Sequence, residues 1–263
     1  MFGEEAISFD LPELDITDMS SLLKIKKHKP DVVVNTAALH NTDACEDQPE
    51  VTFKVNALGA RNVALLAEEL GAINVYISTD FIFDGEKTQA YLESDPAYPL
   101  SVYGVSKLTG ELFTRAGSSK YYILRVASLF GLASNKERRI NFVETMIRLA
   151  QKNKQLRVID DIIMSPTYTH HVAIAFQKML ELKLPFGVYN VVNSGISSWF
   201  EFTREIFKIL EQAMPIEPVT SDEFKTKAKR PKFSVLDNGK LKEHGIEMPA
   251  WRDGLKEYLS SRE

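Results

Sequence analysis

Hydrophobic residues form several uninterrupted runs along the chain, each followed by small or hydroxyl-bearing residues. The clearest runs lie within residues 30–38, 72–81 and 121–126. Short apolar runs without alternation are typical of parallel strands that are covered on both faces. Between the first two runs, residues 49–70 have apolar side chains at helical spacing, which predicts a long amphipathic helix. The expected buried side of this helix consists of Val51, Val55, Leu58, Val63 and Leu66.

The second half of the chain has shorter elements of both kinds. Its patterns predict helices and strands within residues 142–152, 156–159, 188–192 and 198–210. Near the N-terminus, residues 6–10 are predicted to form a strand. Thr17 or Asp18 is the expected N-cap of a helix that ends near Lys29. Strands that alternate with helices indicate an α/β fold with a doubly wound parallel sheet.

The composition is that of an ordinary globular protein, with 44% hydrophobic and 26% charged residues among 263. The 32 basic and 36 acidic residues give a net charge of −4 without a basic stripe, so nucleic acid is not an expected partner. The apolar runs are far shorter than the roughly 20 residues of a membrane helix. A single cysteine, Cys45, cannot form an internal disulfide and is expected to be a thiol on a helix surface. We therefore expect a cytoplasmic protein that does not bind membranes.

The strongest chemical signal is a tyrosine and a lysine, Tyr103 and Lys107, placed four residues apart in a predicted helix. This spacing puts both side chains on one face of the helix, one turn from each other. A phenol has an unperturbed pKa of about 10, and a nearby cation favours its ionised form. Lys107 is therefore expected to bring the pKa of Tyr103 towards neutral pH, although the same spacing also occurs by chance in many helices.

Two of the predicted strands supply further groups to the same place. Thr79 ends the strand within residues 72–81, and small residues follow the strand within residues 30–38. Ligands of open α/β sheets bind outside the carboxyl ends of the strands. We therefore expect Thr79 and Tyr103 to face one crevice, beside backbone that a ligand can approach closely.

With these motifs the chain resembles the extended short-chain dehydrogenase/reductases, and within them the dTDP-4-dehydrorhamnose reductases of nucleotide-sugar synthesis. The matching segments are Asp15-Ile16-Thr17-Asp18, Pro30-Asp31-Val32-Val33-Val34-Asn35, Asn56-Ala57, Ser78-Thr79-Asp80, Tyr103-Gly104-x-Ser106-Lys107, Asn141-Phe142-Val143, Ser165-Pro166-Thr167 and Arg230-Pro231. The resemblance implies a Rossmann-like NAD(P)-binding domain in residues 1–130. A smaller substrate-binding domain is implied for residues 131–263, with approximate boundaries and segments that cross between the two.

The resemblance also implies an activity, the reduction of the 4-keto group of a dTDP-4-dehydro-6-deoxyhexose by NADH or NADPH. In it, Tyr103 donates a proton to the sugar oxygen, Lys107 holds the cofactor ribose, and Thr79 hydrogen-bonds the carbonyl oxygen. Cofactor contacts are expected from Asp15, Ile16, Ala38, Leu39, His40, Tyr103 and Lys107. Contacts to the nucleotide-sugar are expected from Thr79, Asp80, Ser128, Asn141 and Arg230.

Some positions depart from the family pattern. Ser128 stands where relatives often have a tryptophan against the sugar, and Phe81 where many have a tyrosine. His40 stands where a small polar residue is usual, so it is either a ligand contact or a surface loop histidine. These differences leave the identity of the sugar open.

The chain has no glycine-rich turn of the kind that lets the backbone approach a cofactor pyrophosphate. Compared with the family, about 20 to 25 residues are absent, which comprise the first strand, the turn and most of the first helix. The gene start lies upstream, the chain is truncated, or the protein has lost its cofactor. Asp10 ends the first predicted strand, where an acidic residue favours NADH over NADPH unless it is simply a solvated loop carboxylate.

Other functions stay open. A relative serves as a non-catalytic regulatory subunit of methionine adenosyltransferase, and nucleotide-sugar epimerases and dehydratases share the tyrosine and lysine. Assembly as a homodimer is also compatible with the family. We expect no metal site, because the adjacent His170 and His171 point about 100° apart on a helix.

Overall fold

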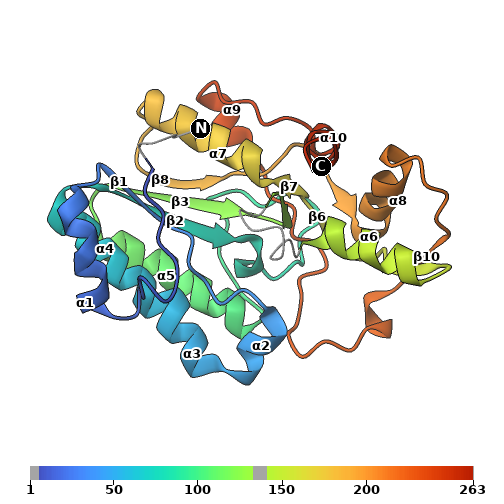
Figure 1. Cartoon of the computed structure of the whole chain (residues 1–263), viewed down its shortest axis with the longest axis horizontal. Helices are drawn as coiled ribbons and strands as arrows, with labels where there is room; N and C mark the ends of the chain where they lie inside the picture. Colours follow the sequence, from blue (N-terminus) through green and yellow to red (C-terminus); the bar gives the residue numbers. More distant parts are fainter. Residues whose placement is uncertain (1–5, 133–140, 263) are drawn as a thin grey trace.

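The computed structural model describes residues 6–132 and 141–262. Its centre is a parallel sheet of four strands, in the spatial order β1-β2-β3-β8 (Figure 1). The strands are β1 (Val32–Asn35), β2 (Ile73–Thr79), β3 (Tyr121–Val126) and β8 (Gly187–Asn190). These strands and the parallel α/β architecture were predicted from the hydrophobic runs, and both predictions are confirmed.

Helices cover both faces of this sheet. On one face lie α4 (Ala60–Leu70) and α5 (Val102–Gly117), and on the other lies α7 (Thr169–Glu181) (Figure 1). Phe176 and Met179 of α7 pack in one hydrophobic cluster with side chains of β2, β3 and β8. Because most strand side chains are buried on both faces, the sequence of the strands lacks polar alternation.

The long helix expected in residues 49–70 is present, but it contains a wider turn. It consists of α3 (Pro49–Phe53), a π-helical turn (Lys54–Gly59) and α4. Val63 and Leu66 are buried as predicted, whereas Val51 and Leu58 are 45% and 48% exposed. A π turn inserts one residue into the helix and rotates the part that follows relative to the part that precedes it. The predicted burial of Val51 and Leu58 assumed one continuous α-helical period and is wrong.

The N-terminal segment differs from the prediction. Residues 6–10 form no strand, and among the described residues none pairs with the free edge of β1. A strand needs a hydrogen-bonded neighbour, so this segment is held by side chains instead: Phe9 and Leu14 pack in a cluster with α4. The helix that follows was predicted correctly. Asp18 caps α1 (Met19–Leu22), which continues as a 3₁₀ helix (Leu23–His28).

A second lobe holds a core of its own, rich in aromatic rings. It is built from α6 (Phe142–Lys152), α8 (Trp199–Ile209), α10 (Trp251–Ser260) and the parallel pair β5 (Leu156–Ile159) and β10 (Ile216–Val219). Two short pairs join it to the sheet: β4 (Leu129–Phe130) with β7 (Thr167–Tyr168), and β6 (Ile163–Met164) with β9 (Ser197–Ser198). The rings at its centre belong to Phe130, Tyr168, Phe202, Trp251 and Tyr258.

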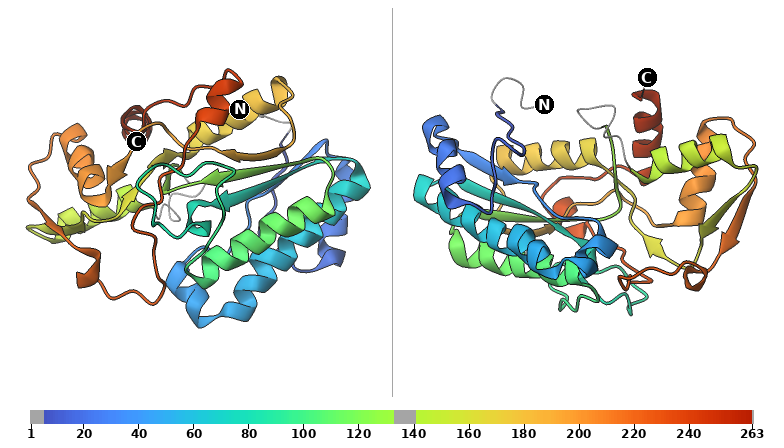
Figure 2. Two further views of the ribbon diagram at one scale, coloured as in Figure 1. Left: turned by 180° about the vertical axis from the view of Figure 1, so that it is seen from behind. Right: turned by 60° about the horizontal axis from the view of Figure 1, so that its bottom comes forward.

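The two lobes are not separate along the chain. Strand β8 and helix α7 come after residue 131, yet they belong to the parallel sheet. The chain therefore leaves the sheet after β3, forms part of the second lobe, returns to the sheet with α7 and β8, and then completes the second lobe (Figure 2). None of the helices within residues 6–132 and 141–262 is long and apolar enough to span a membrane.

Candidate active site

The first turn of α5 places Tyr103 beside the carboxyl end of β2. Ser101 caps this helix, because its hydroxyl accepts the N–H of Gly104 at 3.2 Å. The N–H of Val102 is bound by a carboxylate from another element, Glu46 of α2 (Thr42–Asp47), at 2.8 Å. A negative charge near the N-terminus of a helix also stabilises the helix through its dipole. The start of the helix is thus fixed by two acceptors, one of them from a distant segment.

Close packing against the loop after β2 fixes the ring of Tyr103. A Cβ on Gly104 would lie 2.3 Å from the carbonyl oxygen of Phe81, so only glycine lets the helix approach this closely. The ring of Phe81 meets the ring of Tyr103 edge-on, with the centroids 5.8 Å apart. The site geometry therefore requires the glycine that follows the tyrosine.

Thr79 connects Tyr103 to a buried carboxylate. The side chain of Thr79 faces the Tyr103 hydroxyl and by itself lowers the Tyr103 pKa. Thr79 Oγ1 donates to Asp80 Oδ1 at 3.0 Å, and the side chain of Ser234 also acts on Asp80, where it lowers the pKa. These four side chains form a continuous polar chain at the carboxyl end of β2, and the structure brings Thr79 and Tyr103 together in it.

Burial has the largest effect on the pKa values of Asp80 and Tyr103. It raises the pKa of Asp80 to about 6, and the hydrogen bonds from Ser234 and Thr79 only partly offset the effect. Burial also raises the pKa of Tyr103 above its ordinary value, and the neighbouring charge of Asp80 acts in the same direction. The phenol therefore keeps its proton at neutral pH, which suits a proton donor.

Lys107 lies one helical turn from Tyr103, but its ammonium points to other groups. Lys107 Nζ donates to the carbonyl oxygen of Ile77 at 2.6 Å and lies 4.1 Å from the ring centroid of Tyr76. Burial lowers the pKa of Lys107 to about 7, while the charge of Glu111 acts in the opposite direction. The expected lowering of the Tyr103 pKa by Lys107 is not found. A buried ammonium needs an acceptor, and the carbonyl at the end of β2 provides one.

The chain segment after β1 has the features of a ligand-binding edge. Asn35 is 6% exposed, and its Nδ2 has no hydrogen-bond partner within the described part of the chain. The next residues are small or exposed, and Ala38, Leu39 and His40 lie half-buried to exposed. Asn56 holds this segment in place: its Oδ1 accepts the N–H of Leu39 at 2.8 Å, and its Nδ2 donates to the carbonyl oxygen of Leu39 at 3.0 Å. An unpaired buried donor beside accessible backbone fits a polar cofactor.

Asp15 and Ile16 have structural partners in the loop before α1. Asp15 Oδ1 accepts the N–H of Thr17 at 2.8 Å, and the carbonyl oxygen of Ile16 accepts a hydrogen bond from Asn62 at 3.1 Å. The side chain of Ile16 lies directly over Gly59, where a Cβ would be 2.6 Å away. These contacts fix the loop on the helix that carries Asn56.

The three remaining candidates for substrate contacts lie in or near the second lobe. Ser128 follows β3 and has a left-handed backbone conformation, with φ of 43°. Asn141 caps α6, and its Nδ2 donates to the Tyr258 hydroxyl at 3.0 Å, so its amide is already used within the protein. Arg230 is 39% exposed, and its guanidinium lies 3.9 Å from Asp43 of α2.

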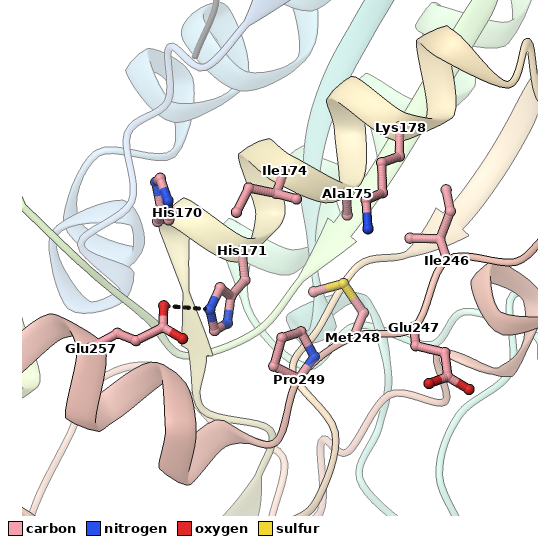
Figure 3. A pocket seen from close by; sticks show the side chains of 10 residues that line it. All are labelled: His170, His171, Ile174, Ala175, Lys178, Ile246, Glu247, Met248, Pro249 and Glu257. Atoms are coloured by element: carbon pink, nitrogen blue, oxygen red, sulfur yellow. Dashed lines mark hydrogen bonds and ion pairs between the residues drawn. The ribbon is translucent and has the colours of Figure 1, made fainter.

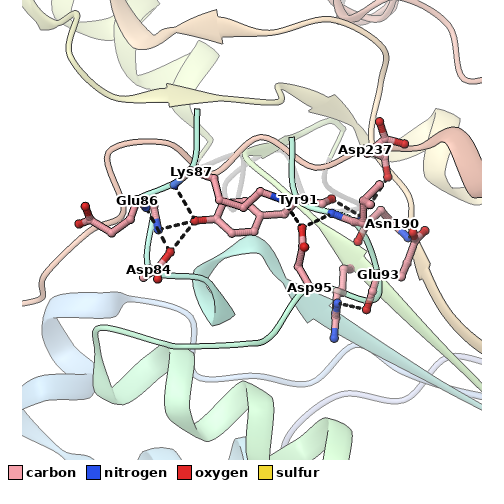
Figure 4. A network of polar contacts seen from close by, with 11 residues as sticks. Asp84, Glu86, Lys87, Tyr91, Glu93, Asp95, Asn190 and Asp237 are labelled. Carbon is pink, nitrogen blue, oxygen red and sulfur yellow. Dashed lines mark hydrogen bonds and ion pairs between the residues drawn. The ribbon is translucent and has the colours of Figure 1, made fainter. Parts of the chain in front are cut away.

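The loop between β2 and α5 is fixed by polar contacts to β8 (Figure 4). Tyr91 Oη donates to Asp84 at 2.5 Å and accepts the N–H of Gly85 at 2.9 Å. Asn190 of β8 donates to the carbonyl oxygen of Tyr91 at 2.8 Å, and its N–H is bound by Glu93 at 2.9 Å. The segment that follows Thr79 is therefore well anchored.

Sequence reasoning missed several residues of this site. Glu46, Asp43 and Ser234 were not singled out, although Asp43 lies four residues from Asp47 and faces a basic run that is distant in the sequence. Cys45, expected on a helix surface, is fully buried, and its Sγ lies 3.4 Å from the carbonyl oxygen of Leu39. This prediction was wrong because α2 packs its Cys45 side inward, where the apolar thiol is favoured.

The two adjacent histidines lie away from this site, at a cavity of about 230 Å³ between α7 and residues 246–249 (Figure 3). His171 is buried, and its two ring nitrogens lie 2.9 Å from Glu257 and 2.8 Å from Asn193. His170 is exposed and does not converge with His171 in the close-up. The buried ring therefore has a full set of protein partners.

Comparisons with known proteins give a consistent result. The family model described as RmlD substrate binding domain matches residues 2–263. The spore coat polysaccharide biosynthesis protein SpsK of Bacillus subtilis is 39% identical over 99% of this chain and 90% of its own length. The dTDP-4-dehydrorhamnose reductase of Aggregatibacter actinomycetemcomitans is 34% identical over 96% of this chain and 88% of its own length.

Solved structures agree. The dTDP-4-dehydrorhamnose reductase of Bacillus anthracis, in complex with NADP, is 36% identical, with a TM-score of 0.91 over 96% of this chain and 89% of that one. A dTDP-4-dehydrorhamnose reductase of Clostridium acetobutylicum is 39% identical, with a TM-score of 0.92 over 97% of this chain and 90% of that one.

Proposed function

The chain belongs to the RmlD substrate binding domain family, and from this membership we propose that it is an NAD(P)H-dependent oxidoreductase of dTDP-rhamnose biosynthesis. The proposed reaction is the reduction of the 4-keto group of dTDP-4-dehydrorhamnose. The supporting relatives are reductases of that name at 34% and 36% identity. The observation that carries the proposal is that Thr79 and Tyr103 face each other at the carboxyl end of β2, beside the ring contact of Phe81 with Tyr103.

A bound nicotinamide cofactor would supply the hydride to the carbonyl carbon. The chain supplies the proton and holds the carbonyl group in position. Tyr103, whose raised pKa keeps it protonated, donates its proton to the oxygen that becomes the hydroxyl group. The hydroxyl of Thr79 holds the same oxygen and orients it towards the phenol. Lys107, one turn along α5, is proposed to hold the cofactor ribose with its ammonium.

Cofactor binding is proposed at the edge formed by the end of β1. The unpaired Nδ2 of Asn35 and the accessible segment Ala38, Leu39 and His40 fit a polar ligand there. Tyr103 and Lys107 complete this edge, and Asp15 and Ile16 are proposed for the adenine end. The structure of the Bacillus anthracis relative contains NADP, which supports NADPH, and NADH is the alternative that the exposed Asp10 favours.

The nucleotide-sugar is proposed to lie between the two lobes. Asp80, Ser128, Asn141 and Arg230 are its proposed contacts, in addition to Thr79. In this division residues 1–130 bind the cofactor and also contribute Thr79, Asp80 and Ser128 to the substrate site, and residues 131–263 bind the substrate, apart from β8 and α7, which belong to the sheet. A homodimer is the proposed assembly, and light scattering of the purified chain tests it.

A titration followed by an activity assay tests the proposal. Calorimetry with NADPH and with NADH should give micromolar binding of at least one of them. The chain should then consume the reduced cofactor only when dTDP-4-dehydrorhamnose is present. Absence of binding to both cofactors in a folded sample would contradict the proposal. Tightly retained NAD in the purified protein, with no net consumption of reduced cofactor, would instead indicate an epimerase or dehydratase.

A further inference from the structure

A basic segment of the second lobe returns to the sheet and lies against α2. Residues 225–234, which we call the strap, follow the 3₁₀ turn Ser221–Glu223 and run back beneath the lobe to the first half of the chain (Figures 1 and 2). The sequence of the strap contains five basic residues, Lys225, Lys227, Lys229, Arg230 and Lys232. Such a run is usually a solvated face, but here it has specific partners.

The first anchor of the strap is on α2. Asp43 Oδ1 accepts the N–H of Ala228 at 3.0 Å, and Asp43 Oδ2 lies 3.9 Å from the guanidinium of Arg230. Lys227 Nζ lies 2.6 Å from both oxygens of Asp47. Asp43 and Asp47 are four residues apart, so one face of the short helix presents both carboxylates to the strap.

The second anchor of the strap is next to Thr79. Gly85, in the loop after β2, packs directly on Pro231: a Cβ there would lie 2.7 Å from the Cβ of Pro231. Ser234, at the end of the strap, is buried next to Asp80, whose pKa it lowers. Asp80 in turn accepts the hydrogen bond of the Thr79 hydroxyl.

Both anchors therefore connect the strap with residues that we propose to act in the reaction. On one side, α2 binds the strap through Asp43 and binds the first N–H of the catalytic helix, that of Val102, through Glu46. On the other side, the strap reaches Thr79 through Asp80. The strap thus connects α2 with the polar side chains that include Thr79.

We propose that Asp43 is a positioning residue for the reaction: it docks the strap on α2 and thereby sets the position of Arg230 over the substrate crevice. The proposal rests on the reductase function proposed above. Asp43 matters more than Asp47 because of burial. Ala228 is 1% exposed, so its N–H depends on the carboxylate, whereas Lys227 and Asp47 are 62% and 52% exposed and form a surface pair of little strength.

Four variants of the full chain separate the contacts of the strap. Asp43→Ala removes both the acceptor for Ala228 and the charge near Arg230. Asp43→Asn keeps an acceptor oxygen and removes only the charge. Asp47→Asn weakens only the exposed pair. Asp31→Asn, an exposed carboxylate before β1 and at the opposite end of the strand from the site, is the matched control.

Two readouts are measured for each variant. The first is kcat and KM for dTDP-4-dehydrorhamnose at saturating reduced cofactor. The second is the rate of cleavage of the free protein by trypsin within the strap, after Lys225, Lys227 or Lys229, followed by mass spectrometry. The second readout does not depend on the reaction, so it tests the docking even if the chain is not a reductase.

For Asp43→Ala we expect KM to rise about tenfold with kcat within about threefold of wild type, the size of effect expected for one lost hydrogen bond from a buried N–H to a partly exposed carboxylate. Strap cleavage should accelerate by a similar factor. Asp43→Asn should give an intermediate effect in both readouts, and Asp47→Asn and Asp31→Asn should stay within about twofold of wild type.

Unchanged cleavage of Asp43→Ala would overturn the docking role, whatever happens to KM. Faster cleavage with an unchanged KM would overturn the role in the reaction. If wild type shows no reductase activity, the proposed function fails, and the cleavage rates alone decide whether Asp43 docks the strap.

Discussion

Two groups of buried polar residues contain a side chain of α5, Glu111 in the first and Lys107 in the second. The two groups differ in how their charges are paired. In the first group, Arg125 donates to both carboxylate oxygens of Glu111 at 2.9 Å, and Ser78 donates to the same carboxylate at 2.6 Å. In the second group, Lys107 Nζ donates to a carbonyl oxygen and lies against a ring, and within residues 6–132 and 141–262 the side-chain partners of Asp80 are hydroxyl groups.

From this difference we propose that the first group stabilises the fold and that the second takes part in the proposed reaction. A buried ion pair with every oxygen satisfied fixes α5 against β2 and β3, and has little free capacity for a ligand. A buried lysine with a pKa of about 7 and a buried aspartate with a pKa of about 6 are costly for the fold. Such groups are typical of functional sites, where an unpaired charge is available to a substrate or cofactor.

The largest expected effect is on turnover. Tyr103→Phe removes the proton donor but keeps the ring against Phe81, so kcat/KM should fall by about 10²- to 10⁴-fold. The melting temperature should change little, because only one hydroxyl is lost. Steady-state kinetics and thermal unfolding of the same sample measure both. A variant with a large loss of stability and a small loss of turnover would contradict the assignment.

The next effect is on stability, and it concerns the paired group. Arg125→Met leaves the carboxylate of Glu111 buried without its bidentate partner, so the free energy of unfolding should fall by about 3–5 kcal/mol. Arg115→Met is the control, because Arg115 is 41% exposed and lies 3.5 Å from the same carboxylate. It should cost less than about 1 kcal/mol in urea unfolding. Equal effects of the two variants would remove the distinction between the groups.

Asp80→Asn should stabilise the protein in a pH-dependent way. The folded pKa of Asp80, about 6, lies above its ordinary value of 3.8, so the stability it contributes is full below the unfolded pKa and is lost as the pH rises through 6. The variant should therefore gain about 1–2 kcal/mol over wild type between pH 5 and pH 8.

Asp84→Asn is the opposite control for that experiment. The hydrogen bond from Tyr91 lowers the pKa of Asp84, so its stabilisation is present at higher pH and is lost as the pH falls. Asp84 titrates below pH 3.8, so urea unfolding should show the same difference from wild type for Asp84→Asn at pH 5 and at pH 8. A pH-dependent difference for Asp84→Asn over this range, or none for Asp80→Asn, would contradict the electrostatic account.

The smallest expected effect is on the pH profile of the wild-type protein. The pKa of Lys107 is lowered to about 7, so its ammonium loses the proton as the pH rises above 7. If this charge supports the proton transfer, kcat/KM should fall about tenfold between pH 7 and pH 8.5. The Asp80→Asn variant should keep this decline, which separates it from the titration of Asp80. A flat profile over this range would exclude a role for the charge of Lys107.

The fold was largely predictable from the sequence because the parallel strands are continuous apolar runs and the helices have clear caps. Asp18, Ser101, Asn141 and Ser198 each accept a backbone N–H at the start of a helix, as residues of these types commonly do. Two features were not predictable. The π turn at Lys54–Gly59 has no distinctive sequence signal, and the 6–10 segment has strand-like residues but no described neighbour to pair with.

The site was predictable only where local spacing determines it. Tyr103 and Lys107 share a helix, and Thr79 ends a strand, so their placement follows from short-range rules. The direction of the Lys107 ammonium, the burial of Cys45 and the contacts of Asp43 depend on packing between distant segments. Asp43 and Ala228 are separated by 185 positions, and no local pattern relates them.

The most direct test of the account follows the hydride and the proton in one experiment. The chain is incubated with dTDP-4-dehydrorhamnose and a reduced nicotinamide cofactor that has deuterium at the transferable position, and the product is analysed by mass spectrometry. We predict one deuterium on the carbon of the former carbonyl group with wild type, and no product with Tyr103→Phe in the same time. Unlabelled product from wild type, or equal labelling by both proteins, would contradict the proposed role of this site.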